Sequence, residues 1–319
     1  HKGESEPFLG RALKKYPRNS FYLATKLPVW LVNSVEDAER LFKEQLSRLQ
    51  TKYIDYYLLH ALDAGRWEKL VKEGIIEWAE AKKASGKIRH LGFSFHDTYL
   101  VFREILTYRQ WDFCQIQYNY IDTQVQAGDK GYELAAKMGV PMVIMEPVKG
   151  GRLANLPEEA KEALNEADPD RSAASWALRW VGSHENVKVI LSGMSSMEQL
   201  EDNLETFGKF QPLTEAEEEA VEKAADLIRS RVKNGCTSCR YCMPCPFGVN
   251  IPEMFSIWNN CAMFDEEEKA KKAYAEQKVQ DASADLCKKC GACEKACPQG
   301  LSIRADLEKV AKELNTEEA

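Results

Sequence analysis

Two cysteine runs decide how the C-terminal part of this chain folds. They read Cys236-x-x-Cys239-x-x-Cys242-x-x-Cys245-Pro246 and Cys287-x-x-Cys290-x-x-Cys293-x-x-x-Cys297-Pro298. Together they hold eight of the ten cysteines in the 319-residue sequence. A Cys-x-x-Cys turn brings two thiolates to one side of the backbone, close enough to share a metal centre. The runs therefore predict a small module built around metal-bound sulfur.

Three closely spaced cysteines followed by a Cys-Pro pair are typical of four-iron clusters. In the bacterial ferredoxin pattern, the fourth cysteine of each run binds the cluster of the other run. The second run has this spacing in full, and the first is one residue shorter before its last cysteine. We therefore predict two 4Fe–4S clusters, one held by Cys236, Cys239, Cys242 and Cys297, the other by Cys287, Cys290, Cys293 and Cys245.

Zinc and disulfide bonds are the alternative interpretations of these cysteines. Two Cys-x-x-Cys pairs suffice for a zinc tetrathiolate, so the doubled pattern leaves more thiols than one zinc site needs. Disulfides require an oxidising compartment, and cysteines two positions apart bridge only with strain. Unbridged cysteines in metal-binding spacing favour the reducing cytoplasm. The charged stretch at residues 265–272, between the runs, predicts a helix, so we expect a helical ferredoxin-like module.

Composition limits the remaining possibilities. The net charge is −7 and no basic patch stands out, which disfavours nucleic-acid binding as a main role. The sequence has no run of 18 apolar residues, so we expect no membrane span. The length is sufficient for one large domain and one small one.

Apolar runs alternate with helical patterns through the first two thirds of the chain. The predicted strands are residues 21–27, 53–60, 88–95, 113–119, 140–146 and 187–192. The predicted helices are residues 5–16, 34–49, 70–84, 100–106, 132–138, 171–181, 197–207 and 214–231, with a further helix at 303–314. Strands that are apolar almost throughout are typical of parallel strands covered on both faces.

This alternation fits either an open doubly wound sheet or a (β/α)8 TIM barrel. The open fold usually has a glycine-rich phosphate turn after its first strand, and this sequence has none. We therefore predict an α/β chain: a barrel whose first strands are missing, at residues 1–231, and a ferredoxin-like domain at 232–319. The sequence starts at His1 inside a helix-starting phrase without an initiator Met, so we expect the natural N-terminus, and any targeting segment, to lie upstream.

Barrel enzymes place reacting groups at the carboxyl ends of their strands. Here those ends carry Lys26, His60, Ser94 with His96, and Gln115. Lysine is seldom fully buried without a partner, so Lys26 directly after an apolar run indicates function. Taken alone, His60 fits a hydrogen-bonded core histidine equally well, and Ser94 and Gln115 fit polar groups that satisfy buried neighbours.

Several phrases in the right order resemble the aldo-keto reductases over residues 1–228. They are Ser5-Glu-x-x-Leu-Gly-x-Ala-Leu, Ala24-Thr-Lys26, Asp55-Tyr-Tyr-Leu-Leu-His60, Gly92-Phe-Ser94, Gln115-Ile-Gln-Tyr-Asn119 and Glu198-Gln-Leu-Glu-Asp-Asn203. The cysteine module resembles a branch of that family with a C-terminal ferredoxin-like extension.

The resemblance implies a catalytic set of tyrosine, lysine, histidine and aspartate. Lys26 would be the lysine that lowers the pKa of the proton-donating tyrosine, and His60 would orient the substrate carbonyl. The tyrosine and aspartate would precede His1. The resemblance also implies a nicotinamide cofactor contacted by Ser94 and Gln115, by Lys149 and Ser195 at its phosphates, and by Gln199 and Asn203 at its adenosine end. Gly193 and Gln199 stand where many family members have Lys and Arg, so NADPH and NADH both remain open.

Two functions follow from these observations. The first is an NAD(P)H-dependent oxidoreductase that transfers hydride within a carbonyl/alcohol pair of a small molecule. Its clusters would exchange electrons with a protein partner, report redox state, or only stabilise the module. The second is a nucleotide-binding electron-transfer or interaction protein without carbonyl turnover.

The chain of 319 residues should not itself reduce carbonyl compounds, because the proton donor implied by the resemblance lies outside it. The measurement is NADPH- or NADH-dependent turnover of an aldehyde by this chain. Rapid turnover would contradict the assignment of the missing tyrosine.

Overall fold

The computed structural model describes residues 3–315, and the chain divides into two compact units. The first unit comprises His1–Gly150 with Ala177–Pro212, and the second comprises Gly151–Trp176 with Leu213–Ala319. The domain boundary predicted between residues 231 and 232 remains a prediction.

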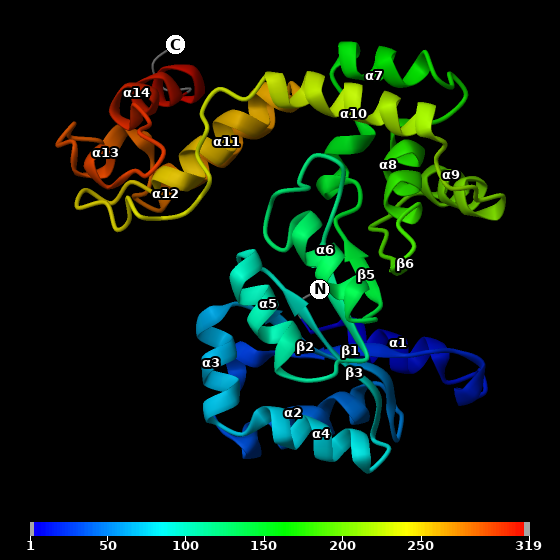
Figure 1. The fold of residues 1–319 in the computed structure, drawn as a ribbon. Helices are drawn as coiled ribbons and strands as arrows, with labels where there is room; N and C mark the ends of the chain where they lie inside the picture. Colours follow the sequence, from blue (N-terminus) through cyan, green and yellow to red (C-terminus); the bar gives the residue numbers. More distant parts are fainter. Residues whose placement is uncertain (1–2, 316–319) are drawn as a thin grey trace. The chain divides into compact units, whose positions relative to one another are not determined.

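The first unit is built on one parallel sheet, which confirms the predicted α/β fold (Figure 1). Its strands pair in chain order as β1 (Ala24–Leu27), β2 (Ile54–Leu62), β3 (Ile88–Phe95), β4 (Phe113–Gln117), β5 (Met142–Met145) and β6 (Val187–Ile190). Each strand lies within or across one of the predicted apolar runs. Among the described residues, β1 and β6 are the two edges of the sheet.

Helices follow the strands as the alternation predicted. They are α1 (Ser5–Leu13), α2 (Val35–Arg48), α3 (Ala64–Lys72), α4 (Ile75–Ala84), α5 (Tyr99–Tyr108), α6 (Gly128–Lys137), α8 (Ala173–Gly182) and α9 (Met197–Gly208), with 3-10 turns η1 (Arg18–Ser20), η2 (Val29–Leu31) and η3 (Lys149–Ala154). The single helix predicted at residues 70–84 is wrong. Gly74 adopts a left-handed φ of 69°, which ends α3 and starts α4.

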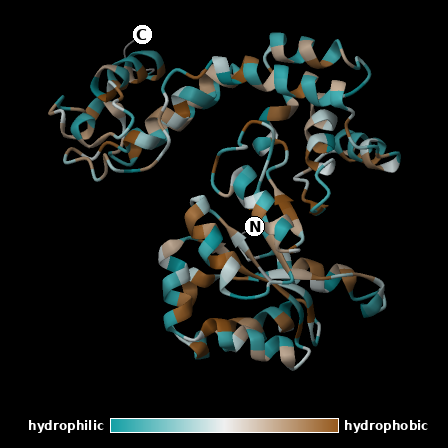
Figure 2. Cartoon of the chain, viewed as in Figure 1, coloured by the Kyte–Doolittle hydropathy of each residue, from teal (hydrophilic) through white to brown (hydrophobic). Residues whose placement is uncertain are grey.

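The core of the first unit lies between the sheet and these helices. Phe42 of α2 contacts Tyr57 of β2 and Trp78 of α4 edge to face, with ring centroids 5.2 and 5.8 Å apart. Figure 2 shows hydrophobic residues along the strands and alternating hydrophobic and hydrophilic residues along the helices. This one-sided burial of each helix is what the 3.6-residue spacing of its apolar positions predicts.

A buried carboxylate fixes the start of the sheet. Asp55 accepts hydrogen bonds from Arg18 (2.6 Å), Arg89 (2.8 Å) and the backbone N–H of Leu23 (2.9 Å). Both guanidinium groups lie 4.0 Å from the ring centroid of Tyr53. Two cations and one amide therefore compensate the desolvation of Asp55 and hold the beginnings of β1 and β2 together.

The second unit is helical. It contains α7 (Glu158–Asn165), which the sequence reading missed, then α10 (Glu215–Ser230), α11 (Ile251–Phe264), α12 (Glu267–Val279), the 3-10 turn η4 (Ala284–Leu286), α13 (Ala292–Ala296) and α14 (Ile303–Leu314). Thr214 and Glu217 form the capping box expected at the start of α10. Phe255, Trp258, Tyr274 and Leu307 form part of the core of the cysteine-bearing part. A helical module around the cysteines is thus confirmed.

Within residues 3–315, no helix combines the length and the apolar character needed to cross a bilayer.

Replacing Gly92 of β3 by alanine should destabilise the sheet. A Cβ at this position would lie 2.6 Å from the carbonyl oxygen of Phe113 and 2.8 Å from its ring, on β4. Overpacking of this kind costs about 1–3 kcal/mol, measurable as a lower free energy of unfolding in urea. Gly193→Ala is the matched control, because its Cβ would meet no atom within 4 Å. Equal stability of the two variants would show that β3 and β4 can separate without cost.

Candidate functional site

Lys26 and His60 lie on neighbouring parallel strands. Lys26 of β1 pairs in register with Leu58 of β2, and His60 follows two positions later. Tyr57 and Leu59 belong to the core beneath the helices, so the alternation of the strand directs Leu58 and His60 to the opposite face. The charge of Lys26 is close enough to lower the pKa of His60. The structure therefore brings the two predicted catalytic residues together.

The backbone directly after His60 is held in an unusual conformation. Ala61 has a left-handed φ of 54°, and the pairing of β2 with β3 shifts register between Leu59 and Leu62. The N–H of Ala61 donates to Oγ of Ser94 at 2.8 Å, and its carbonyl accepts from Nη1 of Arg66 at 2.6 Å. Ser94 thus positions the His60 segment, whatever it does toward a ligand.

Burial lowers the pKa values of both predicted catalytic groups, and neighbouring positive charges lower that of His60 further. Burial lowers the pKa of Lys26. Burial, followed by the positive charges of Lys26, His96 and Arg66, lowers the pKa of His60 to about 4. His60 is therefore a neutral imidazole at pH 7. The ring of Trp30 covers it, with centroids 5.0 Å apart.

His96 lies in the same electrostatic neighbourhood. Burial lowers its pKa, while the carboxylate of Glu146 opposes this shift. Lys26 and Arg66 also act on it. The sequence singled out His96 only by its position after β3, and the structure adds that it shares its charged neighbours with His60.

A buried ion pair, which the sequence reading did not find, lies after β4. Nζ of Lys149 donates to both carboxylate oxygens of Asp122, at 2.7 and 2.6 Å, and both side chains are largely buried. Gln117 and Asn119 also donate to Asp122, at 2.9 and 3.0 Å. Lys149, predicted to contact a cofactor phosphate, is therefore engaged by a carboxylate. The turn Asn119-Tyr-Ile-Asp122 was the available signal, because Asn119 accepts from the N–H of Asp122.

Four non-glycine residues with left-handed backbone lie at or after the carboxyl ends of β2, β4 and β5. Ala61, Gln126, Glu146 and Lys149 all have φ between 49° and 58° without being glycine. Each such conformation costs on the order of 1 kcal/mol and persists only where the surroundings impose it. Strain of this kind concentrates at functional sites, and here it coincides with the predicted one.

The predicted cofactor residues fall in two places. Gln115 is buried on β4 and donates to Sδ of Met145 at 3.2 Å. Ser195, Gln199 and Asn203 gather at the start of α9, where the N–H of Ser195 donates to Oε1 of Gln199 at 2.8 Å and Asn203 donates to Ser192 at 2.9 Å. The first turn of a helix offers free N–H groups, which suit an anion.

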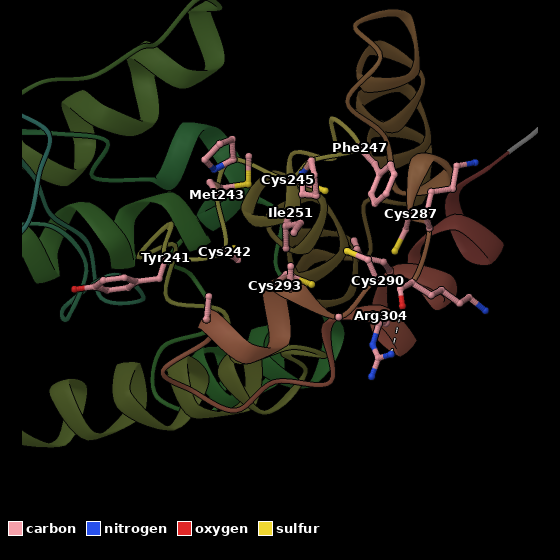
Figure 3. Close-up of a pocket in the computed structure, with 18 residues that line it drawn as sticks. Tyr241, Cys242, Met243, Cys245, Phe247, Ile251, Cys287, Cys290, Cys293 and Arg304 are labelled. Atoms are coloured by element: carbon pink, nitrogen blue, oxygen red, sulfur yellow. Dashed lines mark hydrogen bonds between the residues drawn. The ribbon is translucent and has the colours of Figure 1, made fainter.

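The eight cysteines separate into two sets around two cavities. Cys236, Cys239, Cys242 and Cys297 line one of them. A second cavity, of about 200 Å³, is lined by Cys245, Cys287, Cys290 and Cys293, with Cys242 at its side. Figure 3 shows the sulfur atoms of the second set turned toward one space, with Cys242 apart from them. These are the two sets of four that the spacing predicted.

The thiols of the first set act on one another. Burial raises the pKa of Cys236, and the sulfurs of Cys239 and Cys297 raise it further. Burial likewise raises the pKa of Cys242, with Cys236, Cys239 and Cys297 adding to the effect. A bound group that carries positive charge would relieve this repulsion and the burial cost of the thiolates.

Each cavity is lined by a set of four cysteine thiols. In a four-iron cluster each of four cysteines binds a different iron. The donor set therefore fits 4Fe–4S clusters.

Comparison with known proteins identifies the first part of the chain. The sequence profile of the Aldo/keto reductase family matches residues 1–226. This chain belongs to the aldo/keto reductase family. The profile of a 4Fe-4S dicluster domain matches residues 235–301. The chain is thus an aldo/keto reductase-type, NAD(P)-dependent oxidoreductase with an iron–sulfur domain, as its sequence predicted.

Individual relatives agree with this assignment. The chain is 26% identical over 246 residues to NADH-specific methylglyoxal reductase of Escherichia coli. The matched region covers 63% of this chain and 74% of that relative. It is 27% identical over 262 residues to L-galactose dehydrogenase of Arabidopsis thaliana, spanning 72% and 77%. The holo structure of an aldo-keto reductase from Bacillus halodurans superposes with a TM-score of 0.58 at 29% identity, covering 69% of this chain and 76% of that one.

The low pKa of His60 should make the chain less stable in acid. His60 has a pKa of about 6.5 in the unfolded chain and of about 4 in the folded protein. Between pH 6.5 and pH 4 its side chain is therefore protonated in the unfolded chain and neutral in the folded protein. The free energy of unfolding should therefore fall as the pH decreases through this window, and less steeply for His60→Gln. Denaturant unfolding at pH 7 and pH 5 measures the difference. An NMR titration of the His60 ring near pH 6.5 would contradict the prediction.

Proposed function

We propose that this protein transfers hydride between NADPH or NADH and the carbonyl/alcohol pair of a small molecule, and that it holds two 4Fe–4S clusters. We also propose a cytoplasmic location, which the unbridged cysteines favour. We further propose that the boundary between the two domains lies between residues 231 and 232. The observation that carries the catalytic part is the adjacency of Lys26 and His60 at the ends of paired strands.

The two residues suit different tasks at a carbonyl oxygen. His60 is neutral at pH 7, so it can donate one N–H to the oxygen and orient the carbonyl, but it is not a proton reservoir. Lys26 keeps a half-buried ammonium group beside it. A cation there lowers the pKa of a phenolic proton donor and stabilises negative charge that develops on the oxygen. This division of labour supports reduction of a carbonyl by hydride.

The nicotinamide cofactor supplies or accepts the hydride when bound. The start of α9 supports a site for its phosphates, since the first turn of a helix presents N–H groups to an anion and Ser195 lies just before it. Ser94 and Gln115 are the candidates for the nicotinamide end, and Gln199 and Asn203 for the adenosine end. The names of the two curated relatives, a methylglyoxal reductase and an L-galactose dehydrogenase, support a small carbonyl or alcohol substrate.

NADH should bind to the chain at least as tightly as NADPH. Gly193 and Gln199 offer no cation to a 2′-phosphate, and Glu198 places a carboxylate in the first turn of α9. Fluorescence titration of the iron-loaded chain with each nucleotide gives the two dissociation constants. A large preference for NADPH, on the order of tenfold, would contradict this proposal for the cofactor site. Failure of both nucleotides to bind would contradict the proposed function.

The two cysteine sets should each hold four iron atoms. We expect anaerobic reconstitution to give about eight irons per chain, and Cys297→Ala to reduce this to about four, because that residue completes only one set. Cys261→Ala is the matched control: Cys261 lies on α11 and lines neither cysteine cavity. Iron and sulfide analysis with EPR of the reduced protein measures the loading. A single zinc ion per chain, or no effect of Cys297→Ala, would refute the assignment.

Bleaching of the cluster absorbance by NADH would support electron transfer from the nicotinamide cofactor to the iron–sulfur clusters. Hydride carries two electrons and each cluster accepts one, so direct coupling would need a group that splits the electron pair, such as a flavin, and no flavin motif is visible in the sequence. Clusters that stay oxidised in a protein that binds NADH and turns over would favour a role confined to holding the module together.

A further inference from the structure

Asn234 lies two positions before the first cysteine run and is almost completely buried, with an exposed fraction of 4%. Its backbone N–H, its backbone carbonyl, its side-chain oxygen and its side-chain nitrogen each have a hydrogen-bond partner. A buried polar residue is stable only when its donors and acceptors are paired in this way. Asn234 is therefore held firmly, and its partners show what it connects.

The backbone of Asn234 is attached to α11. Its N–H donates to Oδ1 of Asn259 at 3.0 Å, and its carbonyl accepts from Nδ2 of the same side chain at 2.7 Å. The N–H of Lys233 donates to that oxygen as well, at 3.1 Å. The segment that leads into the first cysteine run can therefore leave α11 only by breaking three hydrogen bonds.

The side chain of Asn234 connects the two cysteine runs. Its Oδ1 accepts from the N–H of Cys236 at 3.0 Å, and its Nδ2 donates to Oδ2 of Asp306 at 2.7 Å. Asp306 lies in the first turn of α14, the helix that follows Cys297. A backbone N–H only donates and an ionised carboxylate only accepts, so these two partners fix the orientation of the amide.

This connection concerns one of the two cysteine sets. Cys236 and Cys297 line the same cavity although they come from different runs. The bond between Asn234 and Asp306 joins positions 72 apart, and these positions flank the two segments that bring Cys236 and Cys297 together. Asn234 itself does not line the cavity. It therefore acts on the ligands and not as one of them.

We propose that Asn234 is a positioning residue for the first cluster, the one assigned to Cys236, Cys239, Cys242 and Cys297. It holds the segments of Cys236 and Cys297 together, so that both thiols face the same cavity. The proposal rests on the cluster assignment made under the proposed function. Residues that orient metal ligands in this way typically change metal affinity by about 10- to 100-fold when they are replaced.

Exchanging the two polar partners tests this role. Asn234→Asp removes the N–H donor and places a carboxylate against that of Asp306, whereas Asp306→Asn alone leaves an oxygen that can still accept from Asn234. The double variant Asn234→Asp/Asp306→Asn restores the bond with donor and acceptor reversed, and the side chain at position 234 can still accept from Cys236. Asn260→Asp is the matched control. It makes the same change on α11, where Asn260 donates to Ser256 of its own helix and lines neither cysteine cavity.

The measurement is the anaerobic release of iron from the reconstituted chain to a chelator, in two backgrounds that each keep one cluster. Cys287→Ala should keep the first cluster, and Cys297→Ala the second. In the Cys287→Ala background, Asn234→Asp should speed the release about tenfold or more. Asp306→Asn and Asn260→Asp should have little effect, and the double variant should return the rate close to that of the background. In the Cys297→Ala background, Asn234→Asp should leave the rate unchanged.

Three results would contradict the proposal in different ways. Equal release from the Asn234→Asp and Asn260→Asp variants of the first background, or no recovery in the double variant, would overturn the positioning role and leave the clusters in place. Faster release in both backgrounds would show that Asn234 stabilises the whole module and would overturn its assignment to one cluster. A chain that binds no iron would overturn the cluster assignment and this proposal with it.

Discussion

Parallel pairing of neighbouring strands determines where every functional side chain of the first unit lies. Parallel strands put all their carboxyl ends at one edge of the sheet, so residues far apart in sequence become neighbours without any contact of their own. Lys26 and His60 are 34 positions apart, yet one register pairing, Lys26 with Leu58, brings them together. The polar partners at this edge, such as Ser94 beneath Ala61, then fix the local backbone.

The strands could be predicted because strands that are buried on both faces must consist of apolar residues. Each is a short apolar run, and a parallel sheet covered by helices accepts only such runs. The helices were harder. A spacing of apolar residues indicates a helix but not a break within it, so the division at Gly74 required the left-handed backbone to be seen. The short α7 was missed because half of its residues, Glu158–Asn165, are charged and because it begins directly after Pro157.

The residues of the candidate site were also predictable only where the signal is local in sequence. The cysteine sets were predictable because ligand spacing is a local property of the chain, and the two cavities gather the same eight residues. Lys149 was not, because its partner Asp122 lies 27 positions away and a lysine in a loop looks free in sequence. Likewise, the low pKa of His60 depends on burial and on the charges of Lys26, His96 and Arg66, whose proximity the sequence does not show.

The exchange of ligands between the two cysteine runs has a consequence for biogenesis. Under the proposed sharing, Cys245 of the first run completes the second centre, and Cys297 of the second run completes the first. The first inorganic core then cannot be finished before Cys297 has been synthesised, and the second, although it uses Cys245, cannot be finished before Cys293 has been synthesised. Loss of one cluster to oxygen would also release the cysteine run that supplies the fourth ligand of the other cluster. The two clusters should therefore be assembled and lost together.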